Sequence, residues 1–355
     1  MKHAPHALRI GDAPPLSELT GIRLGGKPVA EIVLQGKAGV EKLPDLVAEL
    51  GGLPAVIGKG SNIIAADGDL PLVLIRQETR EKASFARHGA EVRVTAPAGL
   101  PLPVLLNAAA AAGLGGLEGL AGIPGSVGGA VAMNAGSFGT EIGSLLRSLT
   151  VFSPRLGLRE IRTGAEQSGD SFKCLGPLIG EDVFRPCPEH SGERGKGGEG
   201  RTLPVGSAAT EFSYRRARCL GLPFGSPAPA AGDFPVLLLE AVFALSESEK
   251  DTVRGRMRAF SAEKRLRQPI SAASAGCVFK NPAPDAPAGR LLEEAGMKGR
   301  ALGGMRFSSL HAGFLVNEGG GSCAAALELI DTAVEAVRRH SGFILEKEVC
   351  LWVGH

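Results

Sequence analysis

The segment Gly119–Gly139 reads GLAGIPGSVGGAVAMNAGSFG and contains seven glycines, one proline and no charged residue. Glycine loses more conformational freedom on folding than any other residue, so a run of this density disfavours a regular helix or strand. What it permits is a backbone that approaches another group closely, with its N–H groups facing outward. We therefore expect the central part, Gly122–Gly136, to be a loop that binds a ligand through its backbone.

A second glycine loop, IGKGSNI (Ile57–Ile63), follows an apolar stretch typical of a strand. Its adjacent N–H groups, with the Ser61 hydroxyl and the Asn62 amide, form the kind of nest that binds phosphate. Neither loop has the spacing of a Rossmann fingerprint or a Walker loop. Two such loops in one half of a chain suit a dinucleotide. The alternative is a pair of tight turns packed closely against their neighbours.

Composition narrows the class of protein. The chain has 355 residues, of which 44% are hydrophobic and 21% charged, which is enough for two or three domains. A net charge of +2 argues against nucleic-acid or membrane-surface partners. We find neither a signal-peptide pattern nor an apolar run long enough for a membrane span. The six cysteines are scattered, so we expect reduced thiols and a cytoplasmic protein.

The composition and the predicted secondary structure change along the chain. Residues 1–18 are rich in proline and polar residues, and we expect a loose tail. Short apolar strands and one helix then alternate as far as residue 78. From 79 to 246, strands and a helix at Leu102–Leu114 flank the glycine run. Residues 168–203 are poor in apolar side chains, so we expect an insertion, and its cysteine and histidine spacing fits no common zinc site.

The last third is mostly helical. Residues 246–269 predict a long helix capped by Ser246 or Ser248, with basic residues in its last turns. Two further amphipathic helices follow. LEKEVCLWVG (Leu345–Gly354) predicts a strand that places Glu346 and Glu348 on one side, and the alternative is a solvated strand edge.

Two other stretches carry candidate chemistry. EFSYRRARC (Glu211–Cys219) sets Tyr214, the only tyrosine of the chain, beside Arg215. Arginine suits bidentate recognition of a carboxylate, although a basic surface strand would look the same. SAGCVFKNP (Ser274–Pro282) contains Cys277, whose thiol can donate a proton while it is neutral. The alternative is a buried structural cysteine.

Eight motifs occur in the order of one known family, and the match runs over Leu16–Gly354 apart from the insertion. They are IRLGG, IGKGSNII, GLEGLAGIPGSVGGAVAMNAGSFGTEI, YR, SAGCVFKNP, AGRLLEEAGMKG, HAGFLVN and EKEVCLWVG. The chain thereby resembles the UDP-N-acetylenolpyruvoylglucosamine reductases. The single tyrosine and HAGFLVN resemble the shorter subtype, which lacks a substrate-binding tyrosine loop.

The resemblance implies an α+β fold. It consists of a two-domain FAD-binding module of the vanillyl-alcohol-oxidase/PCMH type and a smaller α/β substrate-binding domain. On this chain the first FAD-binding part would span 19–78 and include the returning segment 343–355. The second would span 79–246, and the substrate-binding domain 247–342.

The resemblance also implies an activity. The family uses NADPH and FAD to reduce UDP-N-acetylglucosamine enolpyruvate to UDP-N-acetylmuramate in peptidoglycan synthesis. A hydride passes from flavin N5 to C3 of the enolpyruvyl group, and a proton is added at C2. The partners would be small molecules only. Two alternatives are another flavin oxidase or dehydrogenase of the same fold, and a flavoprotein that binds a nucleotide without catalysis.

The family's site residues map onto this chain position by position. Arg215 and Glu348 would hold the substrate carboxylate. Cys277 stands where the family usually has the serine that donates the C2 proton. Because a thiol is a stronger acid than an alcohol, we expect proton donation to persist.

The remaining positions fall into two groups. The FAD-binding positions would be Ile57, Gly58, Lys59, Gly60, Ser61, Asn62, Gly122, Pro124, Gly125, Ser126, Gly128, Gly129, Asn134, Ala135 and Gly136. The substrate-binding positions would be Tyr214, Lys264, Arg265, Arg267 and Asn281.

Overall fold

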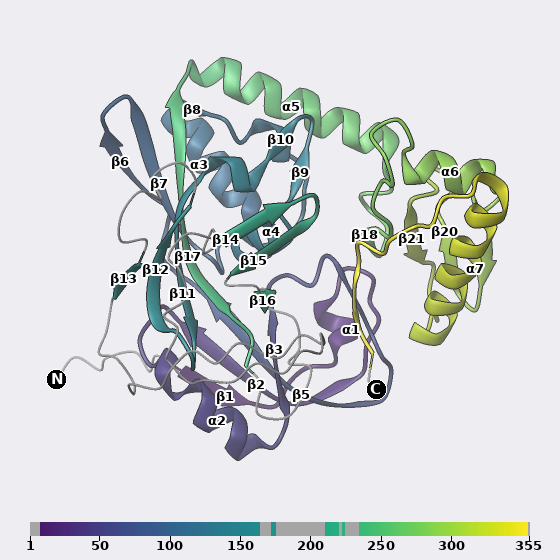
Figure 1. The fold of residues 1–355 in the computed structure, drawn as a ribbon, viewed down its shortest axis with the longest axis horizontal. Helices are drawn as coiled ribbons and strands as arrows, with labels where there is room; N and C mark the ends of the chain where they lie inside the picture. Colours follow the sequence, from purple (N-terminus) through teal and green to yellow (C-terminus); the bar gives the residue numbers. More distant parts are fainter. Residues whose placement is uncertain (1–7, 164–171, 175–209, 220–221, 224–233, 354–355) are drawn as a thin grey trace, which may run out of the picture.

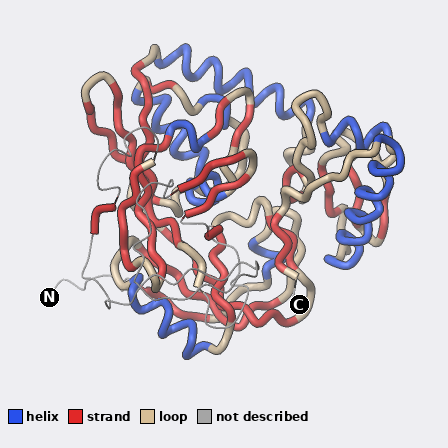
Figure 2. The backbone as a smooth tube through the Cα atoms, viewed as in Figure 1, coloured by secondary structure: helices blue, strands red, loops and turns tan. Residues whose placement is uncertain are grey.

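The computed structural model describes residues 8–163, 172–174, 210–219, 222–223 and 234–353. Strands dominate the larger body of the molecule, and a smaller lobe holds α6, α7 and a compact sheet (Figures 1 and 2). The long helix α5 and the C-terminal segment connect the two (Figure 1). Within the described residues, no helix is both long and apolar enough to cross a membrane.

The first sheet has the strand order β1-β2-β5-β3. Its strands are β1 (Leu8–Gly11), β2 (Lys27–Gln35), β3 (Leu53–Ile57) and β5 (Asp69–Glu78). β2, β5 and β3 are parallel, and the central strands are almost continuously buried, as expected of a sheet covered on both faces. The helices are α1 (Leu16–Leu19) and α2 (Leu43–Leu50), the latter following a 3₁₀ turn at Val40–Lys42.

The N-terminal tail is not loose throughout. Residues 1–7 lie outside the described residues, but Leu8–Gly11 pairs antiparallel with β2. The backbone of this segment completes the ladder at the edge of the sheet, which the polar and proline-rich composition did not indicate. The prediction of a loose tail over 1–18 is therefore wrong from Leu8 onward.

The C-terminal strand β22 (Cys350–Trp352) runs parallel to β4 (Ile63–Ala65), directly after the first glycine loop. The backbone N–H of Cys350 donates to the Asn62 carbonyl at 2.9 Å. The strand predicted over Leu345–Gly354 is thus limited to three residues. Residues 346–349 are instead held by hydrogen bonds to the segment that follows Cys277.

The second sheet has the order β13-β12-β11-β17-β7-β6, with β8 paired to β17. Its strands are β6 (Ser84–His88), β7 (Glu91–Pro97), β8 (Leu114–Gly115), β11 (Leu146–Ser153), β12 (Gly157–Arg162), β13 (Phe172–Cys174) and β17 (Leu237–Glu247). β7 alternates buried and half-buried residues, which is the pattern of a strand with one face in the core. The helices are α3 (Leu102–Ala112) and α4 (Val127–Ala132), with 3₁₀ turns at Glu118–Leu120 and Ile142–Leu145.

Short strands complete this region: β9 (Gly136–Ser137) with β10 (Thr140–Glu141), and β14 (Thr210–Ser213) with β15 (Arg216–Cys219) and β16 (Leu222–Pro223). Of the insertion expected at 168–203, only β13 is described, so that prediction otherwise lies outside the described residues. The two larger sheets share a core, because Phe152, Leu237 and Leu239 pack with Ile32 and Leu34.

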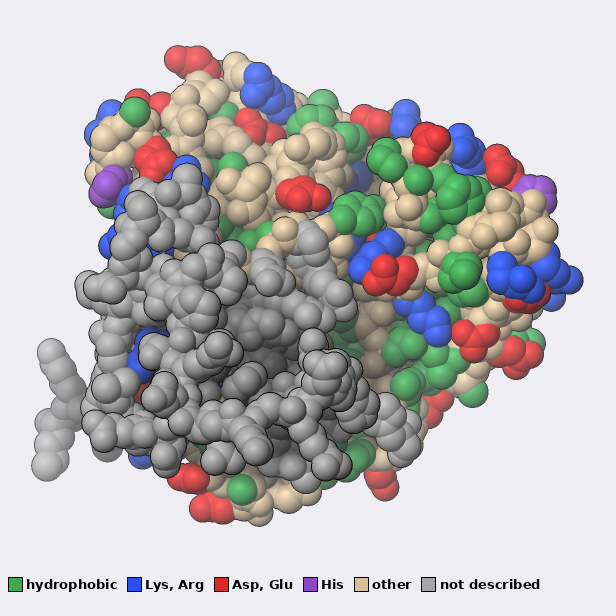
Figure 3. Space-filling view, in the orientation of Figure 1, with side chains coloured by type: hydrophobic (Ala, Val, Ile, Leu, Met, Phe, Trp, Pro, Cys, Tyr) green, Lys and Arg blue, Asp and Glu red, His purple; other side chains and the backbone are tan. Residues whose placement is uncertain are grey.

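The smaller lobe contains an antiparallel sheet of order β18-β21-β20-β19, with α6 (Ala288–Glu294) and α7 (Cys323–Ser341). Its strands are β18 (Ser274–Cys277), β19 (Ala301–Leu302), β20 (Met305–Phe307) and β21 (Phe314–Asn317). The core of the lobe includes Ile22 and Leu24 from the N-terminal region and Leu345 and Val349 from the C-terminal segment. On the face in Figure 3, charges of both signs are interspersed over this lobe.

Helix α5 (Lys250–Arg267) begins later than predicted. Its N-cap is Glu249, and no side chain caps it. Ser246 is paired with Gly115 in the β17–β8 ladder, so the strand extends through the residues predicted to start the helix. The expected serine caps are therefore wrong, because strand pairing takes precedence over the local capping signal.

Candidate active site

A cavity of about 1010 Å³ lies between the two glycine loops and a group of charged side chains. Residues of both loops line it, together with Arg215, Lys264, Cys277 and Glu348. The loops are in contact, since the Ser61 hydroxyl donates to the Pro124 carbonyl at 3.3 Å. Segments far apart in the sequence therefore meet in one site.

The prediction that Gly122–Gly136 is a loop is wrong for Val127–Ala132, which form helix α4, because the Ser126 hydroxyl caps this helix by accepting from the Gly129 N–H. Glycine backbone nevertheless forms much of the loop wall, and several of its glycines leave no room for a side chain. A Cβ atom at Gly58 would lie 2.4 Å from the Ser126 hydroxyl, and one at Gly60 would lie 2.3 Å from a backbone carbonyl. Gly125 has a φ of +133°, in the region that favours glycine. Within the described residues, the backbone N–H groups of Gly60 and Gly125 donate to no protein acceptor. These groups are available to a ligand.

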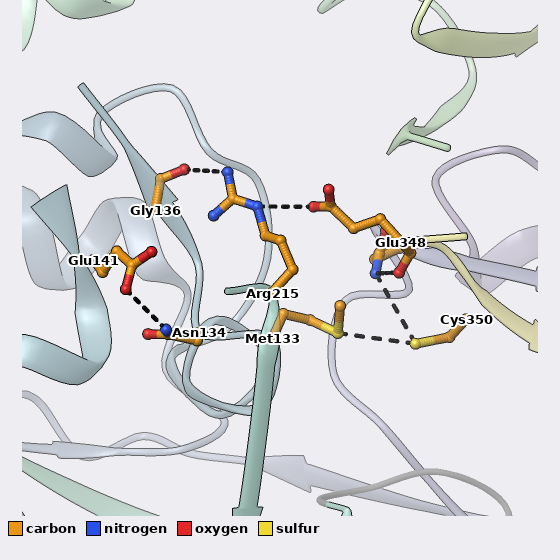
Figure 4. Close-up of polar contacts among 8 residues, drawn as sticks. Met133, Asn134, Gly136, Glu141, Arg215, Glu348 and Cys350 are labelled. Carbon is orange, nitrogen blue, oxygen red and sulfur yellow. Dashed lines mark hydrogen bonds and ion pairs between the residues drawn. The ribbon is translucent and has the colours of Figure 1, made fainter. Parts of the chain in front are cut away.

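Arg215 and Glu348 line the cavity next to the loops and form an ion pair, with 3.1 Å between Arg215 Nε and Glu348 Oε1. The Arg215 guanidinium lies between this carboxylate and the Gly136 carbonyl, to which Nη2 donates at 2.7 Å (Figure 4). Only 20% and 17% of the two side chains are exposed. Arg215 occupies the tight turn between β14 and β15 with a φ of +54°. The arginine is therefore fixed at both its backbone and its guanidinium.

The Glu348 carboxyl is in an unusual electrostatic environment. Burial raises its pKa to about 7, while Arg215 and Lys280 lower it. Its backbone is held on both sides: the N–H donates to the Val278 carbonyl at 2.7 Å, and the carbonyl accepts from the Asn62 amide at 3.2 Å. Near neutral pH this carboxyl is thus both fixed in position and able to carry a proton.

Cys277 ends β18 and lines the same cavity. Burial raises the pKa of its thiol to about 12; Glu348 adds to this effect and Arg215 opposes it. The thiol is therefore neutral at pH 7 and carries a proton to donate. The acidity advantage expected of a thiol over an alcohol is, however, largely removed by burial.

Lys264, a predicted substrate contact, lines the cavity but is largely buried. It is only 5% exposed, and its Nζ donates to the Ala121 carbonyl at 2.8 Å. Burial lowers its pKa to about 8, and Arg215 contributes in the same direction. The ammonium also lies 5.4 Å from the centre of the Phe138 ring. Lys264 thus fastens α5 to the start of the second glycine loop.

The comparisons with known proteins now decide the family. Residues 268–352 match the model of the UDP-N-acetylenolpyruvoylglucosamine reductase C-terminal domain, and residues 40–156 match an FAD binding domain. The chain is 42% identical to the UDP-N-acetylenolpyruvoylglucosamine reductase of Oleidesulfovibrio alaskensis, over 96% of each chain. It is 39% identical to that of Nitratidesulfovibrio vulgaris, over 96% of this chain and 98% of the relative.

The chain belongs to the UDP-N-acetylenolpyruvoylglucosamine reductase family. A solved structure of the reductase from Thermus caldophilus has a TM-score of 0.65 and 25% identity, and the match covers 97% of this chain and 99% of that one. These matches confirm the predicted α+β fold with an FAD-binding module. They also explain why the eight sequence motifs occur in a single order.

Most of the positions carried over from the reductase family line the cavity. The cofactor positions on its wall are Ile57, Gly58, Lys59, Gly60, Ser61, Asn62, Gly122, Pro124, Gly125, Ser126, Gly128, Gly129, Ala135 and Gly136. Arg265 lines it as well. Asn134 does not, because its buried side chain supports the loop from behind. It donates to Glu141 at 3.1 Å and accepts from the Gly143 N–H at 3.0 Å.

Three expected substrate-binding residues also lie off the cavity wall. Tyr214 is 43% exposed, and its ring centre is 5.2 Å from the Arg215 guanidinium carbon. The Arg267 side chain is 75% exposed and pairs with Glu263. The Asn281 side chain accepts from the Ala288 N–H at the start of α6. Because none of the three lines the cavity, a substrate role for them stays a prediction.

Sequence reasoning missed part of the cavity wall of this reductase-family chain. Met133 and Cys350 both line it, with 3.8 Å between their sulfur atoms (Figure 4). Cys350 lies two residues after Glu348, so its position next to an assigned residue was a usable signal. Met133 carried none, because an apolar residue within the glycine run predicts only packing. Among the described cysteine side chains, Cys277, Cys323 and Cys350 are free thiols.

Proposed function

We propose that this chain reduces UDP-N-acetylglucosamine enolpyruvate to UDP-N-acetylmuramate, with FAD as its bound cofactor and NADPH as reductant, for peptidoglycan synthesis. The observation that carries the proposal is the meeting of two backbone loops with Arg215, Glu348 and Cys277 at one cavity. The backbone N–H groups of the two loops suit a cofactor that carries phosphates, and the Arg215–Glu348 pair suits a substrate that carries a carboxylate. We also expect the enzyme to be cytoplasmic and to have only small molecules as partners.

The cavity fits FAD in three respects. Its volume is at the upper end of the ~300–1,000 Å³ typical of small-molecule sites, as a dinucleotide requires. Its glycines leave the space that a Cβ atom would fill, and loop N–H groups are free to bind phosphate oxygens. Gly58–Asn62 would hold the pyrophosphate, and Gly122–Gly136 would surround the remainder. When bound, FAD supplies the hydride that the chain itself cannot.

The domain division supports the same assignment. We propose a first FAD-binding part at 19–78 with 343–355, a second at 79–246 and a substrate-binding domain at 247–342. The first glycine loop comes from the first part, and Arg215 and the second loop come from the second. Cys277 comes from the third, so a ligand in the cavity would touch all three.

Arg215 and Glu348 would bind the carboxylate of the enolpyruvyl group. Hydride addition to C3 places negative charge at C2, and a polarised carboxylate can delocalise it. An ionised Glu348 would repel that carboxylate, whereas a protonated one donates a hydrogen bond to it. The pKa of about 7 for Glu348 makes the protonated form accessible at neutral pH.

Cys277 would then protonate C2. The S–H bond breaks, a C–H bond forms at C2, and the thiol is restored when the thiolate takes a proton from solvent. The Arg215 charge opposes the rise in the thiol pKa, so it also stabilises the transient thiolate. Lys264 and Arg265 are the candidates for the phosphates of the UDP group, since both line the cavity.

The test is an anaerobic titration of the yellow holoenzyme. NADPH is expected to bleach the flavin absorbance, and the enolpyruvyl sugar nucleotide to restore it with one UDP-N-acetylmuramate formed per flavin, identified by mass. If the reduced flavin is re-oxidised only by oxygen or by a simple carbonyl compound, and not by the sugar nucleotide, the chain has a different flavin oxidase or dehydrogenase activity. If NADPH does not bleach the flavin and the sugar nucleotide does not re-oxidise it, the chain is a flavoprotein that binds a nucleotide without catalysis.

A further inference from the structure

Lys280 and Glu346 form an ion pair beside the site that no step above uses. Lys280 Nζ lies 2.6 Å from Glu346 Oε1, and the lysine side chain is only 15% exposed, against 68% for the glutamate. Lys280 comes three residues after Cys277, and Glu346 comes two residues before Glu348. The pair therefore joins the two segments that carry a thiol and a carboxyl of the site.

Backbone contacts accompany this pair. The Lys280 N–H donates to the Glu346 carbonyl at 2.9 Å, and the Glu348 N–H donates to the Val278 carbonyl at 2.7 Å. Phe279 and Lys347 form an antiparallel bridge between them. The segment 346–348 thus lies antiparallel to the residues that follow Cys277, and the side-chain pair closes one end of this contact.

We propose that Lys280 and Glu346 are a positioning pair, which sets the charge acting on the Glu348 carboxyl at the contact between the Glu348 segment and the Cys277 segment. This inference deepens the proposed function and rests on it only for the role of Glu348 in substrate binding. Neither residue needs to touch the substrate. Lys280 acts on Glu348, and Glu346 limits that action by neutralising Lys280.

The electrostatics around Glu348 support this role. The charged and titratable groups that act on it are Arg215 and Lys280, which lower its pKa. Cys277 and Cys350 are its other close titratable neighbours, and both thiols have a raised pKa. Lys280 is therefore a second cation for Glu348, besides the arginine that pairs with it.

The two members of the pair predict opposite effects. Lys280→Met removes a cation, so the Glu348 anion is less stabilised and its pKa rises. Glu346→Gln removes an anion and leaves the Lys280 charge without its partner, so the pKa of Glu348 falls. We expect each shift to be roughly half a unit, because the pair is partly exposed. A purely structural contact would be broken equally by both changes and would predict shifts of the same sign.

The experiment measures the Glu348 pKa directly in the holoenzyme by infrared spectroscopy. The protonated carboxyl band is assigned by its loss in Glu348→Gln and followed from pH 5 to pH 9 in wild type, Lys280→Met and Glu346→Gln. Lys280→Arg keeps the charge and is expected to restore the wild-type value. Lys298→Met is the matched control. Lys298 Nζ lies 2.7 Å from Glu293 Oε1, and neither residue of this ion pair lines the cavity.

The pH profile of flavin re-oxidation by the enolpyruvyl sugar is recorded on the same variants and is expected to shift with the infrared value. Shifts of opposite sign, with no shift in Lys298→Met, support the positioning pair. Shifts of the same sign, or none, overturn it. Glu346→Gln alters an exposed side chain and keeps the test open if Lys280→Met does not fold. Opposite infrared shifts in a protein that does not reduce the sugar would support the pair and contradict the proposed function.

Discussion

The two walls of the cavity are built in different ways. The loop wall is largely glycine backbone, positioned by the turn within Ile57–Ile63 and by the turns and the short helix α4 within Gly122–Gly136. The side-chain wall consists of Arg215, Cys277 and Glu348, which come from three segments more than 60 residues apart. We propose that cofactor binding and substrate chemistry are separable here: adding a Cβ atom should affect the first, and changing a side chain should affect the second.

Gly125→Val gives the largest expected effect on the loop wall. Gly125 has a φ of +133°, and a Cβ atom would lie 3.2 Å from the Ser61 hydroxyl. A β-branched residue is strained in this conformation and would project toward the other loop. We expect the variant to purify without FAD, as measured by the flavin absorbance per protein.

Gly255→Ala provides the control, because Gly255 lies in α5 and a Cβ atom added there would have nothing within 4 Å of it. It should retain full flavin. Equal flavin content in both variants would remove the loop wall from the cofactor site and end the comparison between the walls.

Arg215→Met is expected to act mainly on the substrate step, and it also removes one hydrogen bond to the Gly136 carbonyl of the loop wall. It removes the cation that would polarise the substrate carboxylate, so we expect re-oxidation of the flavin by the enolpyruvyl sugar to slow by ~10²–10³-fold. FAD should stay bound. Arg254→Met, which removes an exposed arginine of α5, serves as the control in the same stopped-flow measurement. Loss of flavin from Arg215→Met would show that the two walls are not separable.

The buried Glu348 carboxyl predicts a smaller effect, on stability. Its pKa is about 7 in the folded protein, against an ordinary value of 4.5, so the folded state binds the proton more tightly. The contribution of this group to stability is therefore fully present below pH 4.5 and is lost as pH rises through 7. Relative to Glu348→Gln, wild type should lose up to about 3 kcal/mol of unfolding free energy between pH 4.5 and pH 8.

Urea unfolding of both proteins across this range measures the difference, and any constant offset from the unpaired Arg215 cancels. Glu294→Gln, at an exposed site on α6, should run parallel to wild type. Parallel curves for wild type and Glu348→Gln would mean that this carboxyl is not perturbed by burial, and would weaken the contrast between the walls.

The same contrast explains what the sequence could predict. The turn at Gly58–Asn62 follows from local glycine density. The loop predicted at Gly122–Gly136 fails at Val127–Ala132, which form α4 because the Ser126 hydroxyl caps this helix by accepting from the Gly129 N–H. The predicted start of α5 is wrong because Ser246 is paired with Gly115 in a strand ladder. The predicted strand is wrong at Glu346–Glu348 because the backbone there is hydrogen-bonded to the residues after Cys277. The burial of Lys264 under the Ala121 carbonyl depends on tertiary packing. The residue types of the site could be named from family motifs, whereas their contacts required the fold.

Cys277 gives the sharpest test of whether one wall binds the cofactor and the other carries out the substrate step. In stopped-flow measurements, Cys277→Ala should bind FAD and be bleached by NADPH at the wild-type rate. Its re-oxidation by the enolpyruvyl sugar should be slower by ~10²–10⁴-fold, the usual contribution of general acid catalysis, and Cys277→Ser should recover much of that loss. Re-oxidation near the wild-type rate in both variants would contradict this division between the walls and remove Cys277 from the substrate step.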